Sequence, residues 1–335
     1  MSPVKTLLLL GIFVLLATAC SPAPVGTPAG TSVPPAPEVL TRVRLPMGYI
    51  PNVQYAPFYV AVEKGYFRDQ GIEIEFDYSY ETDGMALVGA NNLQFTLASG
   101  EQILLARSQG LPVVYIFGWW QNYPVSVAAK ADSGIESPTD LRGKRVGVPI
   151  LAGASYVGLR AILAANGLQE SDLKLEVTGF NQVEALLSDQ VDAVVVYTNN
   201  EPIQLRAMGI EVNEFRVVDY VHLASNGIVT NETTLQENPD LVRRMARAVS
   251  RGIADTLADP DEAFEICKKF VEGLEQADQN IQKQVLAASI DFWENDVIGE
   301  TDRDAWENMQ VVLLEMGLIP QALDLDKAFS NDFIK

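Results

Sequence analysis

Apolar and polar residues alternate along the body of this chain with two different periods, and the period changes from one segment to the next. A period of two, or a short wholly apolar run, is typical of a strand, whereas apolar residues every three or four positions are typical of a helix. The pattern predicts strands at residues 42–47, 73–78, 95–98, 113–117, 144–149, 173–177, 193–196 and 210–212. It predicts helices between them at residues 55–68, 84–90, 102–109, 154–166 and 183–188.

The last part of the chain has an almost wholly helical pattern. Helices are expected at residues 240–257, 261–274, 280–293 and 301–316, separated by turn residues such as Asp259-Pro260. Strands that alternate with helices favour a parallel sheet covered by helices, so the chain is predicted to be an α/β protein. Its order is one α/β unit, a second α/β unit and a helical tail.

The simplest arrangement of these units is a division into two lobes. Lobe 1 would consist of residues 41–126 and 226–335, and lobe 2 of residues 127–225, each a mostly parallel sheet covered by helices. The connections between the lobes, near residues 125–129 and 222–228, are expected to act as hinge strands. Ligands of open α/β sheets bind beyond the carboxyl ends of the strands, so two such sheets that face each other would form one cleft.

The N-terminal segment has the features of a secretory signal. A basic residue, Lys5, precedes a short apolar run that ends in small residues at Ala19, which predicts a signal peptide at residues 1–19. Cys20 follows directly and resembles the acylated cysteine of a bacterial lipoprotein, with a plain cleaved signal and an incidental cysteine as the alternative. Residues 20–40 are rich in Pro, Gly, Ser and Thr and are expected to form a tether between the lipid and the folded body.

The composition argues against several classes of function. The net charge of −20 disfavours nucleic acid and anionic membrane surfaces as partners, because both call for a basic patch. Cys267 is the only cysteine after Cys20, so no internal disulfide is expected, and a hydrophobic content of 48% is ample for a core instead. With a single histidine, His222, the sequence offers neither a His/Cys metal cluster nor a Ser-His-Asp triad.

Short segments of the chain resemble the NMT1/THI5-like proteins, which include bacterial receptors for thiamine pyrimidine precursors, alkanesulfonates and riboflavin. The segments are Tyr49-Ile50-Pro51-Asn52, Glu63-Lys64-Gly65-Tyr66-Phe67, Ala98-Ser99-Gly100-Glu101-Gln102, Lys144-Arg145-Val146-Gly147-Val148 and Val191-Asp192-Ala193. Each segment alone matches the family only loosely, but the order and spacing of the segments together are specific to it. The resemblance implies a periplasmic-binding-protein fold with two hinge strands, and a substrate-binding protein that delivers its ligand to the permease of an ABC importer.

The same family contains a synthase that makes thiamine pyrimidine from its own histidine and pyridoxal phosphate. The synthase carries that histidine in the loop after Pro-Asn, where this chain has Tyr55, and it has a Cys-rich motif that this sequence lacks. The resemblance therefore implies a binding protein that is not an enzyme and carries no cofactor.

The candidate ligand-binding residues follow the predicted strands. They are Tyr49, Asn52, Tyr55, Glu101, Trp119, Trp120, Tyr156, Tyr197 and Glu201. Their aromatic rings offer flat contact surfaces, and their polar groups offer hydrogen bonds. Structural alternatives are a helix cap for Asn52, a carboxylate at a helix start for Glu101, and a core position for one of the two Trp residues.

The candidate loops contain little positive charge, and an anionic ligand would call for an arginine clamp. A flat, neutral heterocycle fits them better, and among the ligands of the resembling family riboflavin is the first choice. A thiamine pyrimidine precursor, formylaminopyrimidine or hydroxymethylpyrimidine, is the second, and an alkanesulfonate is the third. The chain is expected to act as a monomer that its lipid holds at the outer side of the cell membrane.

Overall fold

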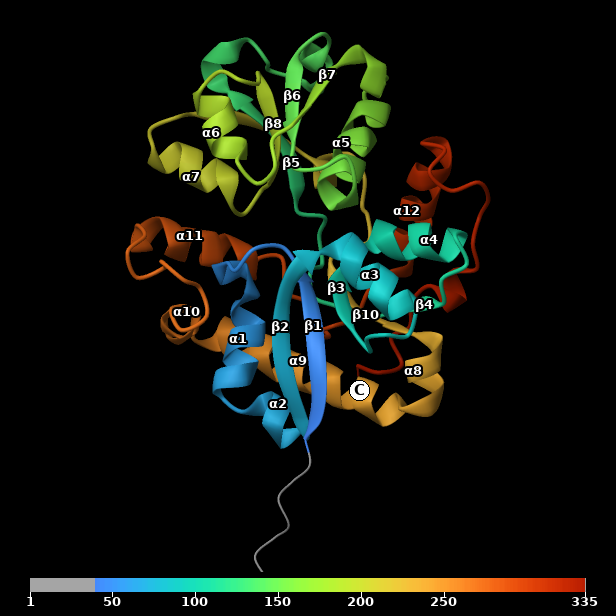
Figure 1. The fold of residues 1–335 in the computed structure, drawn as a ribbon. Coiled ribbons are helices and arrows are strands. Elements are labelled where there is room, and N and C mark those ends of the chain that lie inside the picture. Colours follow the sequence, from blue (N-terminus) through green and yellow to red (C-terminus); the bar gives the residue numbers. More distant parts are fainter. Residues whose placement is uncertain (1–39, 335) are drawn as a thin grey trace, which may run out of the picture. The chain divides into compact units, whose positions relative to one another are not determined.

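Ten strands lie in three sheets in the part of the chain that the computed structural model describes, residues 40–334 (Figure 1). One sheet pairs β1 (Thr41–Gly48) with β2 (Ile72–Tyr80). A second has the order β3-β10-β4, with β3 at Thr96–Ala98, β10 at Gly227–Asn231 and β4 at Val113–Gly118. We call these two sheets and the helices packed on them lobe 1. The predicted signal peptide, Cys20 and nearly all of the predicted tether lie outside the described residues.

The third sheet has five strands in the order β7-β6-β8-β5-β9 and defines lobe 2. Its strands are β5 (Val125–Lys130), β6 (Arg145–Val148), β7 (Lys174–Val177), β8 (Ala193–Tyr197) and β9 (Val212–Arg216). The chain therefore leaves lobe 1 after β4 and returns to it with β10. The exact lobe boundaries at residues 126 and 225 stay a prediction.

One strand in each lobe runs against the others. In lobe 2, β6 is parallel to β7 and β8, whereas β5 is antiparallel to β8 and β9. In lobe 1, β1 and β2 are parallel, and β10 is antiparallel to both β3 and β4. β5 and β10 are the strands with which the chain enters one lobe from the other, so they arrive from the opposite direction. Of the seven strand pairings three are parallel, and the four antiparallel pairings all involve β5 or β10, so the sheets are mixed.

Helices cover both faces of the lobe 2 sheet. Successive residues of a strand point to opposite faces, so β5 and β8 contribute to two separate cores. Val127 and Val195 belong to the core under α5 (Gly153–Ala165), whereas Ala128 and Val194 belong to the core under α6 (Gln182–Leu187) and α7 (Glu201–Ala207). This double coverage explains why the sequence of β8 is a continuous apolar run rather than an alternating one.

Lobe 1 contains the remaining α-helices of the described residues. They are α1 (Ala56–Glu63), α2 (Tyr66–Asp69), α3 (Glu81–Gly89), α4 (Gly100–Ser108), α8 (Glu232–Glu237), α9 (Pro239–Ala258), α10 (Pro260–Cys267), α11 (Gln279–Ile290) and α12 (Arg303–Glu315). Short 3₁₀ turns occur in both parts of the chain. Lobe 1 has η1 (Val53–Tyr55) and η6 (Leu325–Lys327), and the segment between β5 and β10 has η2 (Ala131–Ser133), η3 (Pro138–Leu141), η4 (Glu170–Asp172) and η5 (Val217–Asp219). Within residues 40–334, none of the helices combines the length and the apolar character that crossing a membrane requires.

Two close approaches fix the architecture of lobe 1. The long helix α9 crosses α1 at Gly252, where an added Cβ would come 2.1 Å from the carbonyl oxygen of Pro57. The C-terminal segment closes the free edge of β4: the Tyr115 amide donates to the Ala328 carbonyl at 2.9 Å, and the Ser330 amide donates to the Tyr115 carbonyl at 2.9 Å. The tail thus completes lobe 1 rather than forming a unit of its own.

Several elements differ from the pattern-based prediction. The helix expected at residues 55–68 is divided into η1, α1 and α2, because Gly65 adopts a left-handed conformation with φ of +77° and ends the α1 segment. The helix expected at residues 261–274 stops at Cys267. Helices α7 and α8 were not predicted, since each spans at most two turns and shows little periodicity.

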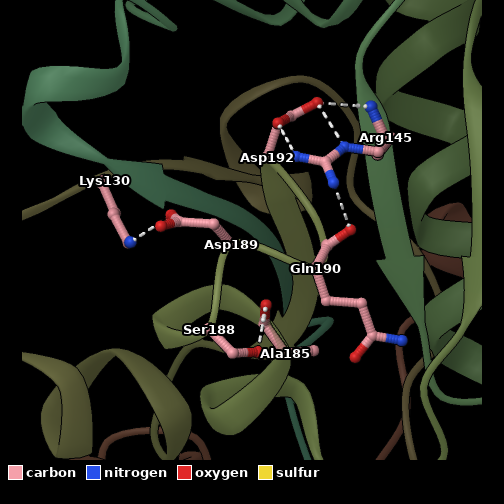
Figure 2. Close-up of polar contacts among 7 residues, drawn as sticks. All are labelled: Lys130, Arg145, Ala185, Ser188, Asp189, Gln190 and Asp192. Atoms are coloured by element: carbon pink, nitrogen blue, oxygen red, sulfur yellow. Dashed lines mark hydrogen bonds and ion pairs between the residues drawn. The ribbon is translucent and has the colours of Figure 1, made fainter.

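A charged cluster ties together the starts of β6 and β8 (Figure 2). The backbone amide of Arg145 donates to Asp192 at 2.8 Å, and its guanidinium donates to the two carboxylate oxygens of Asp192 at 3.3 and 2.6 Å and to the Gln190 carbonyl at 2.8 Å. Lys130 pairs with Asp189 beside it at 2.7 Å. Arg145 lies at the amino end of β6, so this cluster lies at the opposite end of the sheet from the carboxyl ends of β6 and β8. Its role is therefore structural.

Candidate functional site

A cavity lies between the two lobes, and its walls come almost entirely from the carboxyl ends of strands. The segments after β1, β2 and β4 line it in lobe 1, and the segments after β6, β7 and β8 line it in lobe 2. Asn226, directly before β10, completes the wall. The space between the walls is about 800 Å³, part of which is open to solvent. Ligands of open α/β sheets bind beyond the carboxyl ends of the strands, and this cavity lies beyond the carboxyl ends of strands in both lobes.

Aromatic rings form the lobe 1 wall. The ring of Trp119 is stacked on Tyr55, with centroids 5.3 Å apart, and on Trp293, with centroids 6.4 Å apart. Trp120 stands at 82° to Trp119, at a centroid distance of 5.3 Å. Much of the Trp119 ring is therefore already covered by protein. Both indoles are almost completely buried, with exposed fractions of 3% and 2%.

Three polar atoms of the cavity residues have no hydrogen-bond partner among the described residues. They are the indole nitrogens of Trp119 and Trp120 and the side-chain oxygen of Asn226. The backbone holds these residues together, because the Asn226 carbonyl accepts from the Trp119 amide at 3.1 Å and from the Trp120 amide at 2.9 Å. Buried polar groups are rarely left unpaired, so the hydrogen bonds of these two donors and one acceptor are unsatisfied in this part of the wall.

Contacts between aromatic residues join the lobes across the cavity. Phe180, in the segment after β7, meets Tyr49 edge to face, with centroids 4.6 Å apart, and lies 5.9 Å from the Tyr80 ring. Tyr197 meets Trp120 at 82° and 6.0 Å. A hydrogen bond at 2.7 Å from Asn199 in lobe 2 to Ser289 on α11 adds a further link. The lobes are thus in direct contact around the cavity.

Two carboxyl groups line the cavity, those of Glu81 and Glu201, and no Lys, Arg or His lines it within the described residues. Glu201 is 6% exposed and accepts from the Tyr197 amide at 3.0 Å and from Asn200 at 2.9 Å. Burial raises its pKa from 4.5 to about 7. Burial and the neighbouring Glu101 carboxyl also raise the pKa of Glu81. Anions would meet no compensating charge in this cavity.

Six of the nine sequence-predicted residues lie in the cavity wall. These are Tyr49, Tyr55, Trp119, Trp120, Tyr197 and Glu201. The Asn52 side chain instead accepts from the Gln54 amide at 3.0 Å and caps η1.

Glu101 and Tyr156 also lie away from the cavity wall. Glu101 is fully buried behind the wall, where it accepts from Tyr123 at 3.0 Å. Tyr156 turns away to Glu170 and Arg160, whose guanidinium donates to its hydroxyl at 2.9 Å. Cys20 lies outside the described residues.

Other cavity residues were missed by the sequence reasoning. Glu81 is the first residue of α3 and Phe180 lies in the loop after β7. Both come after a strand, so the rule that found the other loops would have found these two. Asn226 precedes a strand, and no signal in the sequence marks it.

Comparisons with known proteins agree with this architecture. The riboflavin-binding protein RibY of Chloroflexus aurantiacus is 41% identical over 340 residues, which cover 98% of this chain and 97% of that protein. The formylaminopyrimidine-binding protein of Halalkalibacterium halodurans is 26% identical over 304 residues, covering 88% of this chain and 91% of that protein.

A solved structure and a family model complete the comparison. The periplasmic aliphatic sulphonate-binding protein SsuA of Escherichia coli superimposes with a TM-score of 0.69 at 14% identity, over 88% of this chain and 99% of SsuA. It therefore shares the periplasmic-binding-protein fold with this chain. The model described as NMT1/THI5 like matches residues 52–263. The chain belongs to the NMT1/THI5-like family.

Proposed function

We propose that this chain is the extracytoplasmic, lipid-anchored substrate-binding protein of an ABC importer, and that it binds riboflavin between its lobes for delivery to a membrane permease. The observation that carries the proposal is the cavity itself. Its wall is aromatic, and among residues 40–334 no Lys, Arg or His lines it and two indole N–H donors and one amide oxygen of the wall have no hydrogen-bond partner. An uncharged, flat ring system with carbonyl and N–H groups meets each of these features.

The relatives support the same ligand class. RibY, with 41% identity over nearly the whole chain, carries the name of a riboflavin-binding protein. The formylaminopyrimidine-binding relative supports a thiamine pyrimidine as the second candidate. Receptors for thiamine pyrimidines tend to have Asp-Trp where this chain has Gly48-Tyr49, which favours riboflavin. An alkanesulfonate is the weakest candidate, because its negative charge would face Glu81 and Glu201 without a cation.

A binding role is also favoured over catalysis. Tyr55 stands where the synthases of the family have their reactive histidine, and its hydroxyl donates to the Met47 carbonyl at 2.8 Å inside the protein. A phenol that is buried in this way is poorly placed to react. Lipid attachment at Cys20 and docking on a permease complete the proposal.

Titration of the protein with riboflavin, followed by flavin and tryptophan fluorescence, tests the ligand. We expect saturable quenching at one site per chain. Trp120→Leu should weaken binding by at least about tenfold, since it removes an aromatic contact and a hydrogen-bond donor worth together about 2 kcal/mol. Tyr156→Phe is the matched control and should bind as the wild type does, because Tyr156 faces away from the cavity. No quenching by riboflavin, with binding of formylaminopyrimidine instead, would replace riboflavin by the second candidate.

A further inference from the structure

Two carboxyl groups lie close together, one in the lobe 1 wall and one behind it, at the starts of α3 and α4. Glu81 lines the cavity and is partly exposed to it, whereas Glu101 is fully buried. Ser99 stands between them. Its hydroxyl lies 2.6 Å from one oxygen of Glu81 and is also within hydrogen-bond distance of one oxygen of Glu101. The two acids are therefore linked through a single side chain.

The hydrogen-bond donors around Ser99 have too few protons to satisfy both acids as carboxylates. A serine hydroxyl has one proton and can donate only one hydrogen bond, so one of its two carboxyl contacts needs a proton from the acid. The other donors do not supply it, since the Ser99 amide bonds Glu81 at 3.1 Å and Gln102 bonds Glu101 at 3.4 Å, each with a proton of its own. The Tyr123 hydroxyl lies 3.0 Å from the second oxygen of Glu101 and 3.1 Å from the Ala154 carbonyl, and it can serve only one of them.

No charged side chain compensates the pair. Neither carboxyl takes part in an ion pair within residues 40–334, and the titratable groups that face it from the neighbouring elements are all acids: the phenols of Tyr55, Tyr123 and Tyr197, with Glu201 beyond. The Asn226 amide donates to the second oxygen of Glu81 at 3.3 Å and is neutral. Two adjacent negative charges in such surroundings are unfavourable, so one of the acids keeps its proton.

We propose that Glu81 and Glu101 share one proton through Ser99, and that this proton determines which ligands the cavity accepts. With the proton in place, the wall carries one negative charge instead of two and tolerates an uncharged ligand against Glu81. Such a ligand removes the remaining contact of Glu81 with water, so binding favours the protonated pair and takes up a proton at high pH. The ligand in this statement rests on the proposed function, whereas the shared proton does not.

Infrared spectroscopy of the ligand-free protein tests the shared proton by itself. The comparison is made in a Glu201→Gln background, because Glu201 has a pKa of about 7 and would give an acid band of its own at pH 7. In this background we expect a carboxylic-acid C=O band at pH 7 that is lost on adding Glu101→Gln or Glu81→Gln, since either change leaves a single carboxylate that Ser99 can satisfy. Glu170→Gln, which removes a carboxyl on the surface of lobe 2, is the control and should keep the band. Spectra in which the Glu201→Gln parent and both pair variants made in it have the same acid band would overturn the proposal.

Calorimetry with riboflavin in two buffers of different ionisation enthalpy tests the consequence for binding. The wild type should take up one proton per ligand at high pH, and its affinity should fall by about tenfold per pH unit there, as one linked proton requires. With Glu201 replaced by glutamine in both proteins, because that acid also lines the cavity, Glu101→Gln should bind without proton uptake. Binding with no proton uptake in the wild type would overturn the role of the pair in ligand choice and leave the proposed function intact. An acid band in a protein that does not bind riboflavin would support the shared proton and overturn the proposed function.

Discussion

Replacing Glu201 by glutamine removes the single carboxyl group that lobe 2 contributes to the cavity, and it leads to a quantitative expectation. The pKa of this buried group rises from 4.5 to about 7 on folding. The folded protein therefore binds the proton more tightly than the unfolded chain does. As a result, the contribution of Glu201 to the free energy of unfolding is largest below pH 4.5 and falls as the pH rises toward about 7.

The size of this loss follows from the pKa shift. A change from 4.5 to about 7 corresponds to about 3 kcal/mol, since one pKa unit is worth about 1.4 kcal/mol. The glutamine side chain of the Glu201→Gln variant keeps an oxygen that can accept from the Tyr197 amide, but it cannot ionise. Relative to this variant, the wild type should therefore lose about 3 kcal/mol between acid and mildly alkaline pH.

Urea unfolding of both proteins, in the absence of ligand and at intervals between acid and mildly alkaline pH, measures this difference. The other acids of the cavity also titrate, but they are common to both proteins and cancel in the comparison. Glu170→Gln, a change on the surface of lobe 2, should follow the wild type. A difference between wild type and Glu201→Gln that stays constant over the whole pH range would refute the reasoning about Glu201.

Three further predictions concern the framework. Gly252→Ala should lower the free energy of unfolding by about 1–3 kcal/mol, because a Cβ there meets the Pro57 carbonyl at 2.1 Å; urea unfolding with an unchanged midpoint would contradict this. Asp192→Asn should cost about 1 kcal/mol, as the ion pair with Arg145 is partly exposed, and the loss should shrink in high salt. In a Cys20→Ala background, the buried Cys267, whose pKa burial raises, should react with thiol reagents only as fast as the protein unfolds; rapid labelling of the native protein would count against its burial.

The sequence predicted the cavity residues best where a strand is followed directly by a loop. Tyr49, Trp119 and Tyr197 are of this kind, since they stand at or immediately after the ends of β1, β4 and β8 and the position of a strand end fixes where they lie. The same reasoning failed for Tyr156, which lies inside α5. Its neighbour Ser155 lines the cavity, but a helix turns by about 100° per residue, so the next side chain points elsewhere.

Two other features were beyond the reach of the pattern. The partnership of Glu81 with Glu101 joins residues twenty positions apart through the hydroxyl of Ser99, and hydrophobic periodicity carries no information on such contacts. The directions of β5 and β10 depend on which lobe the chain has just left. Apolar runs predict that these segments are strands, but they do not give their orientation.

The insertion of β10 between β3 and β4 has a consequence for the order in which the chain folds. β3 and β4 are entirely buried, yet in sequence they precede by more than a hundred residues the strand that they share. While the chain is being made from its N-terminus, the backbone groups of both strands that will bond to β10 stay unpaired until residues 227–231 follow. Lobe 2 is continuous from β5 to β9 and can form its sheet in the meantime. Exposed strand edges pair readily with other chains, so nascent lobe 1 is the part in which a chaperone would be most needed.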